Sequence, residues 1–156
     1  MKITSPAFKE GGMIPSLYTC EGKNINPQLE FENIPPGTKS LVLIMDDPDV
    51  PASVRPERMY DHWVVFNIPP STHKIKEHTT PPGIQGRSTN GKNQYVGPCP
   101  PFGEHRYFFK FYALDTMLDL PLGATKKEVE KAMHGHIIAE CHLMGKYEKG
   151  KGVQRA

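Results

Sequence analysis

The chain has 156 residues, a length typical of one domain, with 37% hydrophobic and 23% charged residues. Its formal net charge of +2 at pH 7 is too small to indicate a nucleic-acid partner. No stretch approaches the roughly 18 consecutive apolar residues of a membrane-spanning helix. The first residues, 1–6, lack the apolar core of a signal peptide. We therefore expect residues 1–156 to form a single cytoplasmic domain without an integral membrane segment.

Sixteen prolines and fourteen glycines interrupt the apolar runs before long helices could form, which predicts a mostly-β fold with ordered turns and one or two helices. Short strands are expected around residues 3–8 and 29–31. The run 40–45 is apolar after its first residue, which is typical of a central strand buried on both faces. Residues 62–68 and the aromatic-rich residues 106–114 predict two further strands.

The polar, proline-containing residues 71–82 are interpreted as a connector, and residues 87–95 as a surface loop. One helix is predicted near the C-terminus, because Thr125 can cap it, Glu128 completes a capping box and Gly135 can end it. Apolar residues alternate after Gly135, which predicts a strand packed on one side. The apolar helix face comprises Val129, Ala132 and Met133, and the alternating residues of the strand are Ile137, Ala139, Cys141 and Leu143.

The three cysteines, Cys20, Cys99 and Cys141, have no metal-ligand spacing, and their odd number argues against a disulfide framework. We interpret them as small buried or partly exposed thiols, although one fortuitous disulfide remains open. Cys99 lies between two prolines and is interpreted as bracing a turn.

Three predicted strands each carry a titratable side chain at one end. Asp47 follows the run 40–45, and His62 and His105 stand at the start of the next two long strands. If the first two strands run antiparallel and the third runs in the direction of the second, these side chains meet at one edge of the sheet. Alternatively, each histidine is an ordinary satisfied polar residue, and Asp47 caps its own turn. Together, the three residues predict a small polar pocket.

The residue types of such a pocket favour the binding of an anion over catalysis. Neutral histidines donate one N–H to an anionic oxygen, and protonated ones add charge. Asp47 would repel the anion unless it orients a histidine proton or is itself protonated, so binding should depend on pH. Backbone N–H groups around Gly103 could add an anion-binding nest. No motif places a nucleophile beside the histidines or indicates a metal site, so we expect no catalytic residue, no metal and no cofactor.

Seven short motifs carry a resemblance to a known family. They are Ile14-Pro15, Tyr18-Thr19-Cys20-Glu21-Gly22, Asp47-Pro48-Asp49-Val50-Pro51, Asp61-His62-Trp63-Val64-Val65-Phe66-Asn67, Gly97-Pro98-Cys99-Pro100-Pro101, Gly103-Glu104-His105-Arg106-Tyr107 and Ala113-Leu114-Asp115. Taken jointly they are highly specific. Over nearly its whole length, the chain resembles the phosphatidylethanolamine-binding protein family, also called Raf kinase inhibitor protein-like, in its short bacterial and archaeal branch.

The resemblance implies a large central antiparallel β-sheet flanked by a smaller sheet, with a helix–strand unit near the C-terminus. It implies a surface anion pocket lined by Asp47, His62 and His105. Val50-Pro51 resembles a position at which the family has a cis peptide. Because the sequence ends at Ala156 soon after its last predicted strand, we expect it to lack the longer C-terminal helix that borders the pocket in eukaryotic members. The implied walls or supports of the pocket are Pro51, Trp63, Pro98, Pro101 and Tyr107.

The leading hypothesis is a non-enzymatic binding and regulatory protein. It would recognise a phosphate-bearing small molecule, a lipid head group or a phosphorylated side chain, and so modulate a protein kinase. The alternative is a serine-protease inhibitor that acts through the surface loop 87–95, since the family includes such inhibitors. A third hypothesis, a hydrolase or other enzyme, would require His62 or Asp47 for turnover. A homodimer formed through an exposed apolar sheet face is a further expectation.

Overall fold

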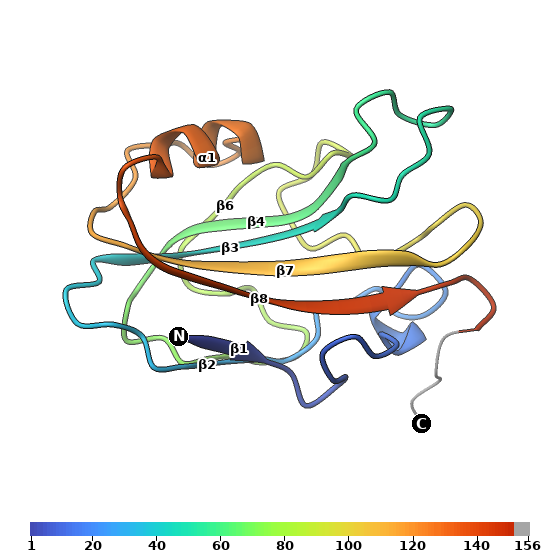
Figure 1. Cartoon of the computed structure of the whole chain (residues 1–156), viewed down its shortest axis with the longest axis horizontal. Coiled ribbons are helices and arrows are strands. Elements are labelled where there is room, and N and C mark those ends of the chain that lie inside the picture. Colours follow the sequence, from blue (N-terminus) through green and yellow to red (C-terminus); the bar gives the residue numbers. More distant parts are fainter. Residues whose placement is uncertain (152–156) are drawn as a thin grey trace.

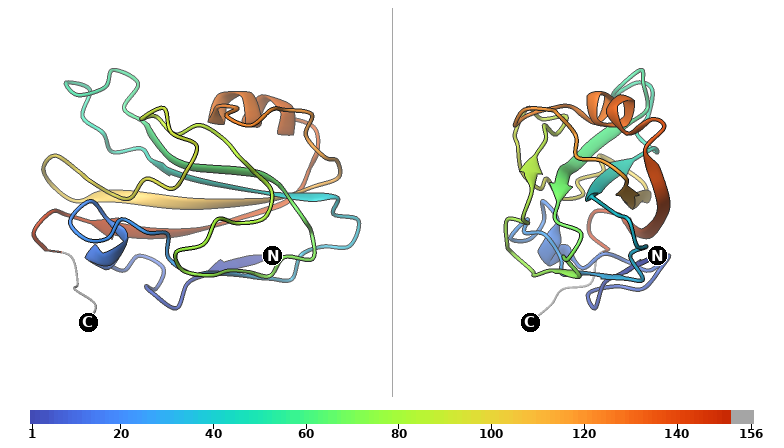
Figure 2. Two further views of the ribbon diagram at one scale, coloured as in Figure 1. Left: turned by 180° about the vertical axis from the view of Figure 1, so that it is seen from behind. Right: turned by 90° about the vertical axis from the view of Figure 1, so that its left-hand side faces the viewer.

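The protein consists of two antiparallel β-sheets and one α-helix, which a computed structural model describes for residues 1–151 (Figure 1). The larger sheet has the strand order β6-β4-β3-β7-β8, and the smaller sheet has the order β1-β2-β5. The small sheet covers one face of the large sheet, and the helix covers the other (Figures 1 and 2). The elements are β1 (Lys2–Thr4), the 3-10 helix η1 (Ser16–Tyr18), β2 (Leu29–Glu32), β3 (Ser40–Asp47), β4 (Tyr60–Ile68), β5 (Lys74–Ile75), β6 (Ile84–Gln85), β7 (His105–Leu114), α1 (Lys126–Met133) and β8 (Ile137–Tyr147). The predicted mostly-β fold is confirmed.

Strand β3 lies at the centre of the large sheet and pairs antiparallel with both β4 and β7. Every residue of β3 is buried, as its continuous apolar run predicts. Leu41 and Leu43 face the core between the two sheets, whereas Val42 and Ile44 face the core beneath the helix. Because β4 and β7 run in the same direction, both begin beside the end of β3.

Helix α1 begins at the predicted capping box. The Thr125 hydroxyl accepts the backbone N–H of Glu128 at 3.2 Å, and the Glu128 carboxylate accepts that of Thr125 at 3.0 Å. Val129 and Met133 are buried against the large sheet. Gly135, with φ of +83°, turns the chain towards β8 in a conformation that favours glycine. Within residues 1–151 no helix has the length and apolar character needed to cross a membrane.

Strand β8 departs from the predicted alternation at its start. Leu143 is buried, and Ala139 and Cys141 pack against the inter-sheet core, but Ile137 is 41% exposed. The pairing of β8 with β7 shifts by one residue between Ala113 and Leu114. Ile138 is equally exposed, so neither residue faces the core at this end of β8, and the expectation that Ile137 does so is wrong.

Two minor strands were not predicted from the sequence. β5 lies within residues 71–82, which were interpreted as a connector, and β6 lies in the gap before residues 87–95. Each has two residues, too few for a period of two to be recognised. Strand β1 is shorter than expected and ends at Thr4, shortly before Pro6, which has no N–H for pairing.

A disulfide joins Cys20 to Cys99, with their Cα atoms 5.5 Å apart. The interpretation of the cysteines as thiols is therefore wrong for these two and correct for Cys141. The same two segments are also held by hydrogen bonds, from the Cys20 N–H to the Pro98 carbonyl at 3.1 Å and from the Gly97 N–H to the Asn24 side chain at 2.7 Å. Disulfides are typical of oxidising compartments, so a cytoplasmic location stays a prediction.

Replacing both Cys20 and Cys99 by serine should lower the free energy of unfolding. The disulfide spans 79 residues of sequence. Opening a loop of that length restores conformational freedom to the unfolded chain, which costs the folded state about 4 kcal/mol. Urea denaturation without reductant measures the loss. The Cys141→Ser variant, which keeps the disulfide, serves as the control, and equal stability of the two variants would contradict the prediction.

Candidate functional site

A cavity of about 280 Å³ opens where β3 ends and β4 and β7 begin, and we call it the sheet-end pocket. The loop after β3 and the loop before β7 lie at this same end of the large sheet (Figures 1 and 2). Its lining residues are Asp47, Val50, Val54, Arg55, Tyr60, His62, Val96, Gly97, Cys99, Pro100, Pro101, His105 and Tyr107. The strand directions inferred from the sequence do bring Asp47, His62 and His105 together.

The implied walls of the pocket divide into two groups. Pro101 and Tyr107 line it, whereas Pro51, Trp63 and Pro98 do not. Trp63 is almost fully buried and packs edge to face against Tyr95, with ring centroids 5.2 Å apart. It borders a different cavity, of about 400 Å³.

Pro98 and Pro51 make their backbone contacts outside the pocket. The Pro98 carbonyl accepts the Cys20 N–H, and the Pro51 carbonyl accepts N–H groups of the loop that follows β3. The Val50–Pro51 peptide, whose cis or trans state the sequence alone leaves open, is trans, as are all peptide bonds of the described residues.

Asp47 and His105 form the innermost polar pair of the pocket. The Asp47 Oδ2 atom lies 2.6 Å from His105 Nδ1, and both side chains are almost completely buried. The other carboxylate oxygen accepts the Asp49 N–H at 2.7 Å. Burial raises the pKa of Asp47, and the hydrogen bond from His105 opposes this shift. Because an ionised carboxylate only accepts, the Nδ1 atom of His105 carries the hydrogen of this bond.

The loop after β3 is anchored beside this pair. The Arg106 guanidinium donates two hydrogen bonds to Asp49, at 2.9 and 2.8 Å, and the Arg106 backbone N–H donates a third at 2.9 Å. This contact lowers the pKa of the Asp49 carboxyl group. The start of the loop is thereby fixed to the start of β7.

His62 reaches the pocket through a β-bulge. On β4, Val64 and Phe66 face the core beneath the helix, so strict alternation would turn His62 to that side as well. However, Met45 pairs with Trp63 and the next residue of β3 pairs with Asp61, which leaves His62 as an extra residue. The bulge turns its side chain to the face that carries Asp47.

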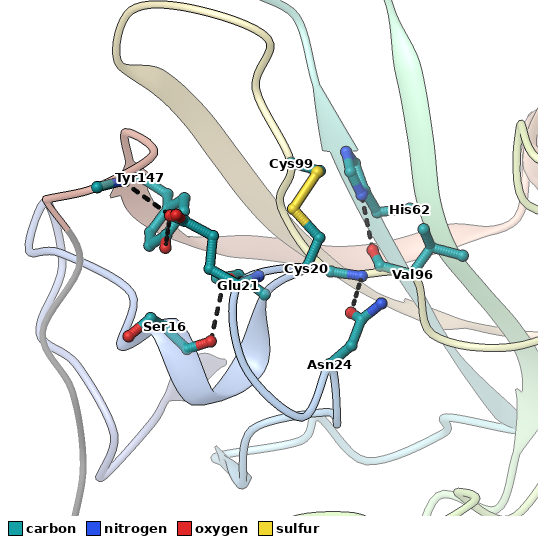
Figure 3. Close-up of a disulfide and its surroundings, with 11 residues drawn as sticks. Ser16, Cys20, Glu21, Asn24, His62, Val96, Cys99 and Tyr147 are labelled. Carbon is teal, nitrogen blue, oxygen red and sulfur yellow. Dashed lines mark hydrogen bonds between the residues drawn. A yellow bond between two sulfur atoms is a disulfide. The ribbon is translucent and has the colours of Figure 1, made fainter.

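The His62 ring is held in one orientation. Its Nδ1 atom lies 2.6 Å from the carbonyl oxygen of Val96 (Figure 3). A carbonyl only accepts, so Nδ1 carries the hydrogen. Burial lowers the pKa of His62 to about 4, and the ring is therefore neutral at pH 7. The rings of Tyr60 and Tyr107 pack on it, with centroids 4.6 and 5.3 Å away.

The Tyr107 hydroxyl is the one buried polar group of the pocket lining that lacks a hydrogen-bond partner among the described residues. Burial, followed by the nearby charge of Asp47, raises the pKa of Tyr107, so the hydroxyl keeps its hydrogen. It is consequently a donor without a hydrogen bond of regular geometry within residues 1–151, and the Asp47 carboxylate is a nearby acceptor.

The pocket also contains residues that sequence reasoning missed. The Arg55 guanidinium lies 5.7 Å from the centre of the Tyr60 ring and bonds Glu57 at 2.9 Å. Tyr60 could have been found, because it directly precedes the Asp61-His62 motif. Arg55 lies in an irregular loop, where no sequence period indicates which way a side chain points.

Asp46, next to Asp47, points to the opposite face of the sheet. It is fully buried and bonds the ammonium groups of Lys126 at 2.7 Å and Lys110 at 2.9 Å. Lys126 also lies 3.5 Å from Asp61. This ion cluster joins the helix to the sheet behind the pocket. In residues 1–151 no group of three or more histidine, cysteine, aspartate or glutamate side chains is arranged to hold a metal ion.

Comparison with known protein families identifies the chain. The family model described as phosphatidylethanolamine-binding protein matches residues 4–148, which is nearly the whole sequence. The chain belongs to this family. The resemblance inferred from the seven motifs is therefore confirmed.

Individual members of the family agree with this assignment. A UPF0098 protein of Methanothermobacter thermautotrophicus is 47% identical over 156 residues, which cover 96% of this chain and 100% of the relative. The crystal structure of a homolog of phosphatidylethanolamine-binding protein from Chlamydia trachomatis has a TM-score of 0.92 and 47% identity, covering 94% of this chain and 96% of that one. YbcL of Escherichia coli, described as a new member of the mammalian family, has a TM-score of 0.85 and 29% identity, covering 94% and 97%.

The buried, neutral His62 should make the stability of this family member depend on pH. Its pKa falls from 6.5 to about 4 on folding, so between these values the unfolded chain binds a proton that the folded chain does not. Stability is then lost as the pH falls from 6.5 towards 4, on the order of 3 kcal/mol in total. Urea denaturation at several pH values should show that the His62→Gln variant loses this component. The exposed His142→Gln variant should retain it, and parallel curves for the wild type and His62→Gln would refute the assignment.

Proposed function

We propose that the protein is a non-enzymatic binding module whose sheet-end pocket recognises a phosphate-bearing group, and that it regulates a protein kinase through this recognition. The phosphate belongs to a phosphoethanolamine-like head group or to a phosphorylated side chain. The family's name and the chemistry of the pocket support the ligand class. The kinase follows from the resemblance to the family also called Raf kinase inhibitor protein-like.

The unsatisfied Tyr107 hydroxyl is the observation that carries the proposal. A buried donor without a well-formed hydrogen bond costs free energy, up to about 1–3 kcal/mol, and an anionic oxygen in the pocket would accept from it in place of the nearby Asp47 carboxylate. His105 lies beside it, with ring centroids 6.4 Å apart, and adds positive charge when protonated. Arg55 supplies a further cation at the wall. Donors and cations converging on one cavity favour an anion.

The pocket has no hydroxyl of serine or threonine, no lysine amine and no free thiol to serve as a nucleophile, which supports a binding role over catalysis. The lining contains no serine, threonine or lysine. Its single sulfur atom, that of Cys99, is engaged in the disulfide and cannot attack a substrate. The remaining polar groups are an aspartate, an arginine, two tyrosines and two histidines.

Replacing His105 should weaken the binding of inorganic phosphate and phosphoethanolamine at least tenfold, as measured by titration calorimetry. His105→Gln keeps a donor to Asp47 and removes the charge, so it avoids leaving a buried carboxylate without a partner. His105→Ala removes both the donor to Asp47 and the charge. The matched control is His136→Ala, because His136 also pairs with an aspartate, Asp115, but is exposed and outside the pocket.

Unchanged affinity in both His105 variants, with unfolding curves that show a folded protein, would refute the proposal. The same variants separate it from the alternative of a protease inhibitor. Inhibition of serine proteases that survives the loss of His105 would point to the loop 87–95 instead. Turnover of a phosphate ester that disappears in a His62 or Asp47 variant would establish an enzyme.

A further inference from the structure

The hydrogen-bonding state of His62 restricts which phosphate group fits the pocket. Since Nδ1 donates to Val96 and the ring is neutral, the other ring nitrogen, Nε2, carries a lone pair and accepts. Nε2 points away from Val96 (Figure 3). No donor to it is found among the described residues, and the adjacent rings of Tyr60 and Tyr107 contact His62 as aromatic neighbours. A ligand that satisfies Nε2 must therefore bring a hydrogen.

The charge of the pocket points to a ligand with one negative charge. Among the lining residues Asp47 is the only carboxylate and Arg55 the only permanent cation, with His105 positive when protonated. Glu57, which pairs with Arg55 outside the lining, offsets part of its charge. Asp46 also acts on His62, but its own charge is met by two lysines on the far face. A dianion would find no matching excess of positive charge.

We infer that the sheet-end pocket selects phosphate monoesters in their singly protonated form, with the ligand's P–OH group donating to Nε2 of His62. The Tyr107 hydroxyl donates to an anionic oxygen of the same group. This inference rests on the proposed function and makes its ligand class specific. A phosphate diester, such as the head group of a phospholipid, also carries one negative charge but has no P–OH hydrogen. The site therefore favours phosphorylated side chains over lipid head groups.

If the pocket binds the singly protonated form, binding of a phosphate monoester is coupled to the uptake of a proton by the ligand. A phosphate monoester loses its second proton with a pKa of about 6, so above that pH the bound ligand takes one proton from solvent. The affinity for a monoester should then fall about tenfold per pH unit above 7, whereas the ligand protonation of a diester does not change in this range. The groups of the protein that titrate near His62 are Asp47, His105, Tyr60 and Tyr107, and Asp46 lies behind it. They affect both ligands alike.

The test uses three small probes with the whole protein: methyl phosphate, dimethyl phosphate and glycerophosphoethanolamine. NMR titrations at pH 6 should give methyl phosphate at least tenfold tighter binding than either diester. Between pH 6 and 8 the ratio of the methyl to the dimethyl phosphate affinity should fall about 50-fold, because the monoanion fraction falls by that factor. The ratio cancels the titration of the protein itself.

A variant and a spectroscopic measurement complete the test. His62→Leu removes the acceptor and should bring the ratio of the methyl to the dimethyl phosphate affinity at pH 6 close to one. If this variant does not fold, the 31P chemical shift of methyl phosphate bound to the wild type at pH 7.5 decides. A shift typical of the monoanion supports the inference, and one typical of the dianion overturns it.

The outcomes distinguish this inference from the proposed function. If none of the three probes binds, the proposed function itself fails. If all three bind equally well, phosphate recognition stands and the monoester selectivity is refuted. If glycerophosphoethanolamine binds as tightly as methyl phosphate while dimethyl phosphate binds weakly, the ammonium group supplies the hydrogen to His62, which also overturns the inference.

Discussion

Two adjacent carboxylates are buried at the end of the central strand, and both must be satisfied in surroundings that exclude water. Asp46 and Asp47 are consecutive residues of β3, so their side chains emerge on opposite faces of the large sheet. Asp46 obtains its partners from Lys110 of β7 and Lys126 of α1. Asp47 obtains its partners from His105 and from the backbone of the loop that follows. An unpaired carboxylate at either place would cost several kcal/mol.

This requirement ties distant parts of the chain to one place. The strand β7 serves both carboxylates, with Lys110 on one face and His105 on the other, and the helix is held down on the side of Asp46. The bulge in β4 then adds His62 to the side of Asp47. At the end of β3, the structural ion cluster therefore lies on one face of the large sheet and the candidate ligand pocket lies on the other. Contacts that bind no ligand therefore hold the residues of the pocket in place.

The large-scale fold and the centre of the pocket could be predicted because each followed from a repeated local rule. Continuous apolar runs identified β3 and β4, a capping box located α1, and strand direction placed Asp47, His62 and His105 at one edge of the sheet. The features that escaped prediction depend on contacts between distant residues. The bulge at His62 and the pairing of Cys20 with Cys99 are of this kind, as is the position of Arg55 in an irregular loop. Because of the bulge, Trp63 faces the same side of the sheet as His62, but it lies in the core between the two sheets and not in the pocket. A homodimer and a cytoplasmic location stay predictions, since neither follows from the fold of one chain.

The Cys20–Cys99 disulfide closes a large part of the chain into a covalent ring. The chain between these residues is a closed ring that contains β2 to β6, and with them Asp47 and His62. His105 lies just outside the ring on the segment that leaves it. The exposed loop between β3 and β4 is part of the ring, so a protease that cuts this loop does not release a fragment. Asp47, His62 and His105 would remain on one covalently connected molecule, which separates only when the disulfide is reduced.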